Sequence, residues 1–131
     1  MIVLVDTSIW VDYFRGGSSS GHLDLFLDEN LVTTNDLILA ELIPFLRIKK
    51  ENELIKMLLS IRKNELKINW SQIIEFQFGM FKIGENGVGI SDLIIFQNAK
   101  GYDCHIYAID SHFEKLCQTF NGKMIFDKES V

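Results

Sequence analysis

The chain has 131 residues, of which 47% are hydrophobic and 24% charged, and its formal net charge is −5. This length suits one domain with one sizeable core, and we expect residues 1–131 to form it. The acidic balance argues against a protein that binds nucleic acid over a broad basic surface. No apolar run approaches the roughly 20 residues that cross a bilayer, so we expect a cytoplasmic protein with no membrane partner.

Apolar patterning predicts strands and helices in alternation. Short apolar runs at 1–5, 31–34, 104–109 and 123–126 predict buried strands, and 65–69 is a further strand candidate. Helical spacing predicts helices over 9–14, 37–46, 51–62, 72–83, 92–101 and 111–120, and a short one near 23–27. The expected N-caps are Asn35 or Asp36, Ser71 and Ser91, and Pro44 is expected to bend or end its helix. This alternation predicts an α/β fold, with a parallel sheet covered on both faces.

Positive charge is concentrated in one segment. Between Arg47 and Lys67 the chain has seven basic and three acidic residues, so this segment carries +4 and the remainder −9. Such a segment is either a solvated helix face or a contact strip for phosphates or an acidic partner.

Two aspartates each follow an apolar strand. Asp6 closes MIVLVD and Asp110 closes IYAID, and each precedes a helix that begins with Ser or Thr. The carboxyl ends of the strands line the ligand crevice in a parallel α/β sheet, so the two carboxylates can converge there. Each aspartate can equally be the N-cap of its helix and nothing more.

Two further acids lie in unusual surroundings. Glu41 is surrounded by apolar residues in LILAELIP, where it either points outward on a polar stripe or faces a cation. Asp92 begins a helix after the GVGIS loop, where the helix dipole alone favours an acid. Within one cluster, two carboxylates about 5 Å apart repel by about 3 kcal/mol at an effective dielectric near 20. Such a cluster takes up protons or binds a divalent cation, and oxygen ligands suit Mg²⁺ or Mn²⁺.

At these residues the chain resembles the PIN-domain ribonucleases, and specifically the VapC-type toxins of bacterial and archaeal toxin–antitoxin pairs. The matching stretches are VDTSIWVDYFRG, NDLILAELIP, GVGISDLIIFQNAK and YAIDSHFEKL, in the family's order and at its usual separations. The resemblance covers essentially the whole chain. It implies a PIN-like three-layer α/β/α sandwich with a central parallel sheet. It also implies an endoribonuclease that depends on Mg²⁺ or Mn²⁺, an RNA substrate, a cognate antitoxin protein and a homodimer.

The resemblance also implies a catalytic set, which is Asp6, Glu41, Asp92 and Asp110. Asp6, Asp92 and Asp110 are expected to hold the metal, and Glu41 to bind a second ion or orient the attacking water. Ser8 matches a position where the family often has a hydroxyl or amide near the metal, so we expect it to support the site.

Two other functions remain open. The chain can be a PIN-like protein-interaction module whose metal site is idle, or a metal-dependent phosphatase of another α/β family. A phosphatase with an aspartyl nucleophile needs a second aspartate two residues after the first, and Ser8 stands there.

Several residues outside this set have alternative interpretations. The apolar side chains for which core is favoured over antitoxin contact are Trp10, Tyr13, Phe14, Phe45 and Leu46. The cysteines, Cys104 and Cys117, lack metal-ligand spacing and are expected to be reduced and partly buried. The histidines are scattered, and His112, two residues after Asp110, is the first to test for a metal or base role.

Overall fold

Five short strands form one sheet in the computed structural model, which describes residues 1–125. In chain order they are β1 (Val3–Val5), β2 (Val32–Thr34), β3 (Arg62–Lys63), β4 (His105–Tyr107) and β5 (Lys123–Met124). The strand order across the sheet is β3-β2-β1-β4-β5, and every pairing is parallel. The expected parallel sheet is therefore confirmed. β1 is the central strand and is wholly buried, which explains why MIVLV lacks alternation.

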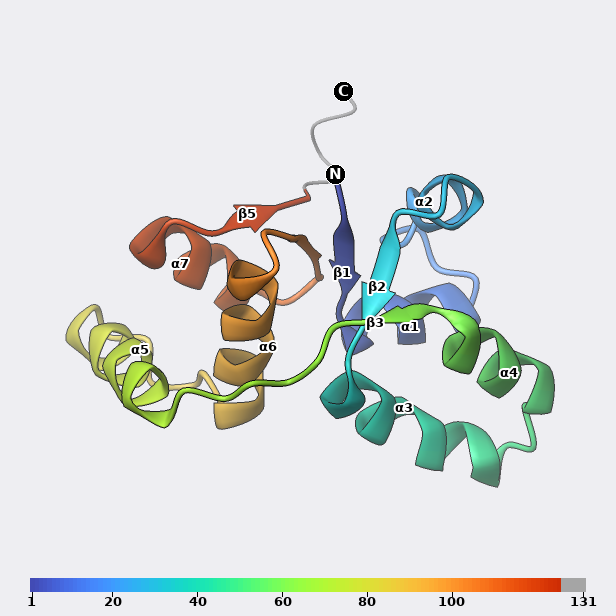
Figure 1. The fold of residues 1–131 in the computed structure, drawn as a ribbon, viewed down its shortest axis with the longest axis horizontal. Helices are drawn as coiled ribbons and strands as arrows, with labels where there is room; N and C mark the ends of the chain where they lie inside the picture. Colours follow the sequence, from blue (N-terminus) through green and yellow to red (C-terminus); the bar gives the residue numbers. More distant parts are fainter. Residues whose placement is uncertain (126–131) are drawn as a thin grey trace.

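Helices cover both faces of the sheet. They are α1 (Thr7–Phe14), α2 (Leu23–Asp28), α3 (Asp36–Ile48), α4 (Asn52–Ser60), α5 (Trp70–Lys82), α6 (Ile90–Gly101) and α7 (Ser111–Phe120). Figure 1 shows α1–α4 gathered on one side and α5–α7 on the other. From β1 the chain runs to β2 and β3 on one side, and it then crosses back to β4 and β5 on the other side. Because the crossovers of parallel strands are right-handed, this change of direction places the later helices on the opposite face of the sheet. The result is the expected three-layer α/β/α sandwich.

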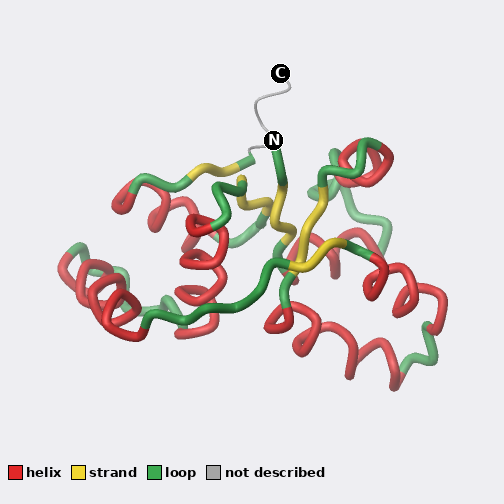
Figure 2. The backbone as a smooth tube through the Cα atoms, viewed as in Figure 1, coloured by secondary structure: helices red, strands yellow, loops and turns green. Residues whose placement is uncertain are grey.

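The connection from β3 to α5 carries the chain from one helix layer to the other, and Figure 2 shows it as a long loop. The strand expected at 65–69 is wrong, because this segment has no partner in the sheet. β3 lies just before it instead, where Arg62 pairs with Thr33 and Lys63 with Thr34. The strand expected over 123–126 is confirmed at Lys123–Met124, whereas Phe126 lies outside the described residues.

Two expected helix caps are also wrong. Asn69, not Ser71, caps α5, since its side chain accepts a hydrogen bond from the backbone N–H of Gln72. α6 begins after Gly89 with no side-chain cap, so Ser91 lies inside the helix. Asn35 caps α3 as expected, and its side chain accepts from the N–H of Ile38 at 2.9 Å.

Pro44 does not end α3, which continues to Ile48. A proline removes the hydrogen bond to the carbonyl four residues earlier, which here belongs to Ala40. Ala40 is exposed, so water can reach this part of the helix and solvate the freed carbonyl. The exposed side of a helix therefore tolerates this proline.

The core contains most of the apolar residues expected in it. Trp10 and Leu46 are buried, while Tyr13 and Phe14 pack partly buried against the core. Phe45 is 50% exposed, so the core assignment is wrong for this residue. Helical spacing explains the difference, because adjacent residues of a helix point in different directions and only one of them can face the sheet.

The two cysteines are free and buried, as expected. Burial raises the pKa of Cys117 to about 11, so this thiol stays protonated and unreactive near neutral pH. Within residues 1–125, no helix is long and apolar enough to cross a membrane.

The basic segment carries exposed ion pairs. Lys63 lies 3.0 Å from Asp36, and Lys56 and Lys67 each pair with a nearby glutamate at 3.7 Å. These pairs favour a solvated face over a strip of unpaired cations that awaits phosphates.

Three buried asparagines link the two helix layers. The side-chain oxygen of Asn98 in α6 accepts hydrogen bonds from Asn35 at 3.0 Å and from Asn64 at 3.4 Å. The Asn98 amide in turn donates to the carbonyl of Glu65, and Thr33 donates to Asn64. This network joins the start of α3 to the middle of α6, and these two helices carry Glu41 and Asp92.

Candidate active site

The sheet topology places a ligand crevice at the carboxyl ends of β1 and β4. β1 is the point from which the chain runs outward in opposite directions, and ligands of open α/β sheets bind at such a point. Asp6 follows β1 directly, and Asp110 follows β4 after two residues. Both are also N-caps, since Asp6 accepts from the N–H of Ser8 and Asp110 from that of His112. Each aspartate can therefore cap its helix and belong to the acid cluster at the same time.

Ser8 connects Asp6 to the loop that carries Asp110. Its hydroxyl donates to Asp6 Oδ2 at 2.6 Å and accepts from the backbone N–H of Ile109 at 3.1 Å. Asp6 is only 6% exposed. Burial raises the pKa of Asp6, the hydrogen bonds from Ser8 oppose this rise, and the Asp110 carboxylate adds to it. The Ser8 hydroxyl therefore keeps one Asp6 oxygen in place beside a second acid.

Glu41 reaches the same region from α3. Its Oε1 accepts a hydrogen bond of 2.8 Å from the hydroxyl of Thr7, the first residue of α1. Burial raises the pKa of Glu41, and the carboxylates of Asp6 and Asp92 raise it further. Glu41 is an exposed residue, but its carboxylate faces the other acids.

Asp92, Asp110 and His112 form the tightest group. Each offers one ligand atom, and these atoms lie within 4.8 Å of one another. The Nδ1 atom of His112 lies 3.5 Å from Asp92 Oδ2 and 3.2 Å from Asp110 Oδ1. Burial raises the pKa of Asp92, the Asp110 and Asp6 carboxylates raise it further, and His112 opposes them.

The donor set fits a divalent cation. Within residues 1–125, no lysine or arginine forms an ion pair with any of the four acids, because the pairs that are present use other carboxylates. His112 Nδ1 is a buried atom with no hydrogen-bond partner. Carboxylate oxygens are ligands of both Mg²⁺ and Mn²⁺, and Mn²⁺ accepts an imidazole nitrogen more readily than Mg²⁺ does. Among residues 1–125, four carboxylates therefore lie together, the His112 ring adjoins two of them, and no lysine or arginine pairs with any of them.

Comparison with known proteins identifies the family. The family model of the PIN domain matches residues 3–118. The chain belongs to the PIN domain family. A comparison with curated proteins found no match.

Solved structures similar to this PIN domain include three at low identity. VapBC2 from Rickettsia felis, bound to a DNA fragment from its promoter, has a TM-score of 0.74 and 18% identity over 95% of this chain and 98% of that chain. FitAcB from Neisseria gonorrhoeae has a TM-score of 0.72 and 18% identity, and the match covers 95% of this chain and 97% of that chain. The third is VapC20 from Mycobacterium tuberculosis, a toxin that cleaves the sarcin-ricin loop. It has a TM-score of 0.60 and 16% identity, and the match covers 86% of this chain and 93% of that chain. At these identities the likeness concerns the fold.

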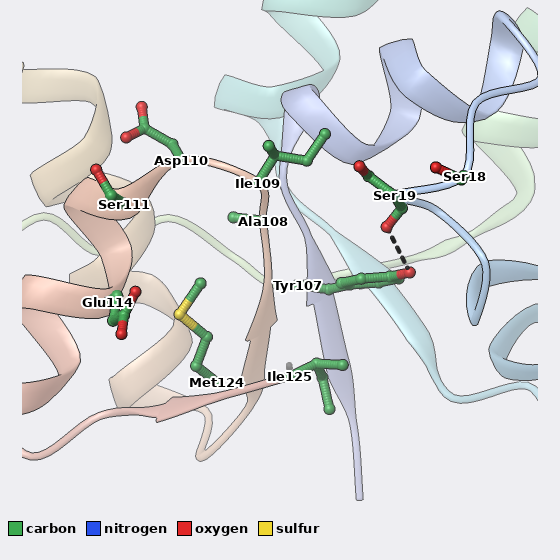
Figure 3. Close-up of a pocket in the computed structure, with 10 residues that line it drawn as sticks. All are labelled: Ser18, Ser19, Tyr107, Ala108, Ile109, Asp110, Ser111, Glu114, Met124 and Ile125. Atoms are coloured by element: carbon green, nitrogen blue, oxygen red, sulfur yellow. Dashed lines mark hydrogen bonds between the residues drawn. The ribbon is translucent and has the colours of Figure 1, made fainter. Parts of the chain in front are cut away.

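A cavity of about 490 Å³ adjoins the acid cluster of the PIN domain. Its lining includes Tyr107, Ile109, Asp110, Glu114 and Met124. Figure 3 shows that the Asp110 carboxylate points away from this cavity, while the Glu114 carboxylate lies beside it. Of the four acids, only Asp110 is among the residues that line this cavity.

Replacing Asp92 by Asn is expected to raise the melting temperature of the metal-free protein. The raised pKa of Asp92 means that the folded protein disfavours the ionised carboxylate. Ionisation therefore costs stability above the folded-state pKa, and this cost disappears as the pH falls through it. Thermal unfolding in EDTA at pH 7 measures the effect. Asp28→Asn, at an exposed aspartate of α2, is the control, and a lower melting temperature for Asp92→Asn would contradict the prediction.

His112 lies outside the catalytic set predicted from the sequence, where it is only the first histidine to test, and the structure brings it into the site. The available signal was its position two residues after Asp110, in the first turn of α7. Helix geometry turns a side chain at this position back toward the N-cap, so its ring lies beside the Asp110 carboxylate.

Proposed function

We propose that this PIN domain is an endoribonuclease that depends on Mg²⁺ or Mn²⁺, and that it is the toxin of a type II toxin–antitoxin pair. The observation that carries the proposal is the convergence of four acids with which, among residues 1–125, no lysine or arginine pairs. These acids come from four separate elements, and three of them have pKa values raised by burial. Charges held in this way favour a bound divalent cation.

Each acid has a proposed role. Asp6, Asp92 and Asp110 hold the cation, and Ser8 keeps Asp6 oriented through its 2.6 Å hydrogen bond. Glu41, held by the Thr7 hydroxyl, orients the attacking water or contacts a second ion. A bound divalent cation supplies the positive charge that activates water and stabilises the leaving oxygen of a phosphodiester.

RNA is the proposed substrate, although the chain is acidic. The cation itself neutralises the local negative charge, so a phosphate can approach the cluster without a broad basic surface. VapC20, which has the same fold, cleaves the sarcin-ricin loop, and this supports RNA cleavage by the present chain.

A cognate antitoxin and a second copy of the chain are the proposed protein partners. Trp70, Ile74, Phe78 and Phe81 are all exposed and recur along one face of α5. An exposed apolar face of this kind supports contact with another protein. The similar VapBC2 and FitAcB structures support the same assignment.

Substrate comparison tests the proposed activity. We expect the purified protein with Mn²⁺ to cut single-stranded RNA internally and to leave p-nitrophenyl phosphate intact. Hydrolysis of the phosphomonoester without RNA cleavage would favour the phosphatase alternative. If neither substrate reacts while an antitoxin binds tightly, the chain is an interaction module with an idle site.

A further inference from the structure

His112 brings a nitrogen donor into an otherwise all-oxygen cluster. Its side chain is 27% exposed, but the Nδ1 atom is buried and has no hydrogen-bond partner. Its polar neighbours are two carboxylate oxygens, Asp110 Oδ1 at 3.2 Å and Asp92 Oδ2 at 3.5 Å, and an ionised carboxylate has no proton to donate to it. The in-plane lone pair of Nδ1 is therefore not used by a protein donor.

The spacing of these atoms matches that of ligands around one cation. Adjacent donors of an octahedral ion with bonds of about 2.1 Å lie about 3 Å apart, and opposite donors about 4.2 Å apart. The Nδ1 contacts of 3.2 and 3.5 Å fall in this range, and the three donor atoms lie within 4.8 Å of one another. No large movement is needed for all three to reach a single ion.

The surroundings also restrain the ring. Gly87 lies against its far side, since a Cβ built at Gly87 would be 3.4 Å from His112 Nε2. The backbone N–H of His112 donates to Asp110 Oδ1 at 2.8 Å, which ties the start of α7 to the same carboxylate. Nδ1 is therefore held toward the acids before any ion binds.

We propose that His112 binds the cation through Nδ1, and that this nitrogen makes the site prefer Mn²⁺ to Mg²⁺. The inference rests on the proposed metal site. Mg²⁺ takes oxygen ligands almost exclusively, whereas Mn²⁺, a first-row transition metal, accepts an imidazole nitrogen among oxygen ligands. A competing account has His112 as a permanent cation that balances Asp92 and Asp110. The two accounts predict opposite results, because a ligand strengthens metal binding and a fixed positive charge weakens it.

The experiment compares Mn²⁺ and Mg²⁺ binding to the wild type and three variants. His112→Gln removes the donor at Nδ1, and His112→Asn places an amide oxygen near that position. His105→Gln is the matched control, because His105 begins β4 at the end of the strand opposite Asp110. Isothermal titration measures the affinity for each ion, and electron spin echo spectroscopy of the Mn²⁺-loaded protein detects directly bound nitrogen. Circular dichroism and thermal unfolding show whether each variant folds.

We expect His112→Gln to lower Mn²⁺ affinity about tenfold or more, on the scale seen for changes near bound metals. Mg²⁺ affinity should fall much less, so the Mn²⁺ preference should shrink in His112→Gln and in His112→Asn. The nitrogen signal of the wild type should disappear in both variants and persist in His105→Gln. Unchanged or tighter Mn²⁺ binding by His112→Gln, or a wild type without a nitrogen signal, would overturn the inference.

The inference and the proposed function fail in different ways. A wild type that binds Mn²⁺ and cuts RNA but shows no bound nitrogen contradicts only the role of His112. A wild type that binds neither ion contradicts both.

Discussion

Asp6→Asn is expected to lower the rate of RNA cleavage by about a thousandfold or more. The change removes one charge from the proposed cation site, and a metal ion contributes several kcal/mol of transition-state stabilisation in such enzymes. Asparagine also caps helices well, so the hydrogen bond from the Ser8 N–H can persist and the fold should remain. The measurement is the initial rate of cleavage of a labelled RNA with saturating Mn²⁺, together with thermal unfolding of the variant.

Asp28→Asn is the matched control for this result. It removes the same charge from an exposed position at the end of α2, so its cleavage rate should equal that of the wild type. If Asp6→Asn folds and cuts RNA within about threefold of the wild type, Asp6 does not belong to the catalytic set.

Asn98→Ala is expected to lower the free energy of unfolding by about 3 kcal/mol. The substitution leaves the amides of Asn35 and Asn64 without their acceptor and the Glu65 carbonyl without its donor. Each unsatisfied buried group costs about 1–3 kcal/mol, and partial access of water to the new space limits the total. Urea unfolding monitored by circular dichroism measures the change.

Asn52→Ala provides the comparison for Asn98, because Asn52 is exposed in the first turn of α4. Its effect should stay within about 0.5 kcal/mol, as for most surface changes. An equally small effect of Asn98→Ala would mean that water replaces the network at little cost. A large effect should be accompanied by weaker metal binding, since the network joins the helices that carry Glu41 and Asp92.

The central strand and the strand-end acids could be predicted because their signals are local. MIVLV is an uninterrupted apolar run, and Asp6 and Asp110 each end an apolar stretch of the sequence. The layers then follow from the alternation of strands and helices and from the handedness of crossovers. The family resemblance added Glu41 and Asp92, whose local context left an exposed or helix-capping role equally open.

Other features depend on tertiary contacts that no local pattern encodes. β3 consists of Arg62 and Lys63, two charged residues that belong to a strand only because β2 lies beside them. The segment 65–69 has strand-like alternation in Leu66 and Ile68, yet the sheet does not extend to it. The position of His112 beside the acids depends on the approach of α6 to α7, which brings Asp92 Oδ2 to 3.5 Å from His112 Nδ1.

Removal of the metal shows directly whether RNA cleavage depends on a cation held by these acids. The wild type is stripped with EDTA, dialysed, and assayed for cleavage of a single-stranded RNA before and after addition of Mn²⁺, with Asp6→Asn treated in parallel. We expect no cleavage by the stripped protein, recovery on addition of Mn²⁺, and no recovery in Asp6→Asn. Cleavage that survives EDTA, or that Mn²⁺ restores equally in Asp6→Asn, would contradict a metal-dependent site built on these acids.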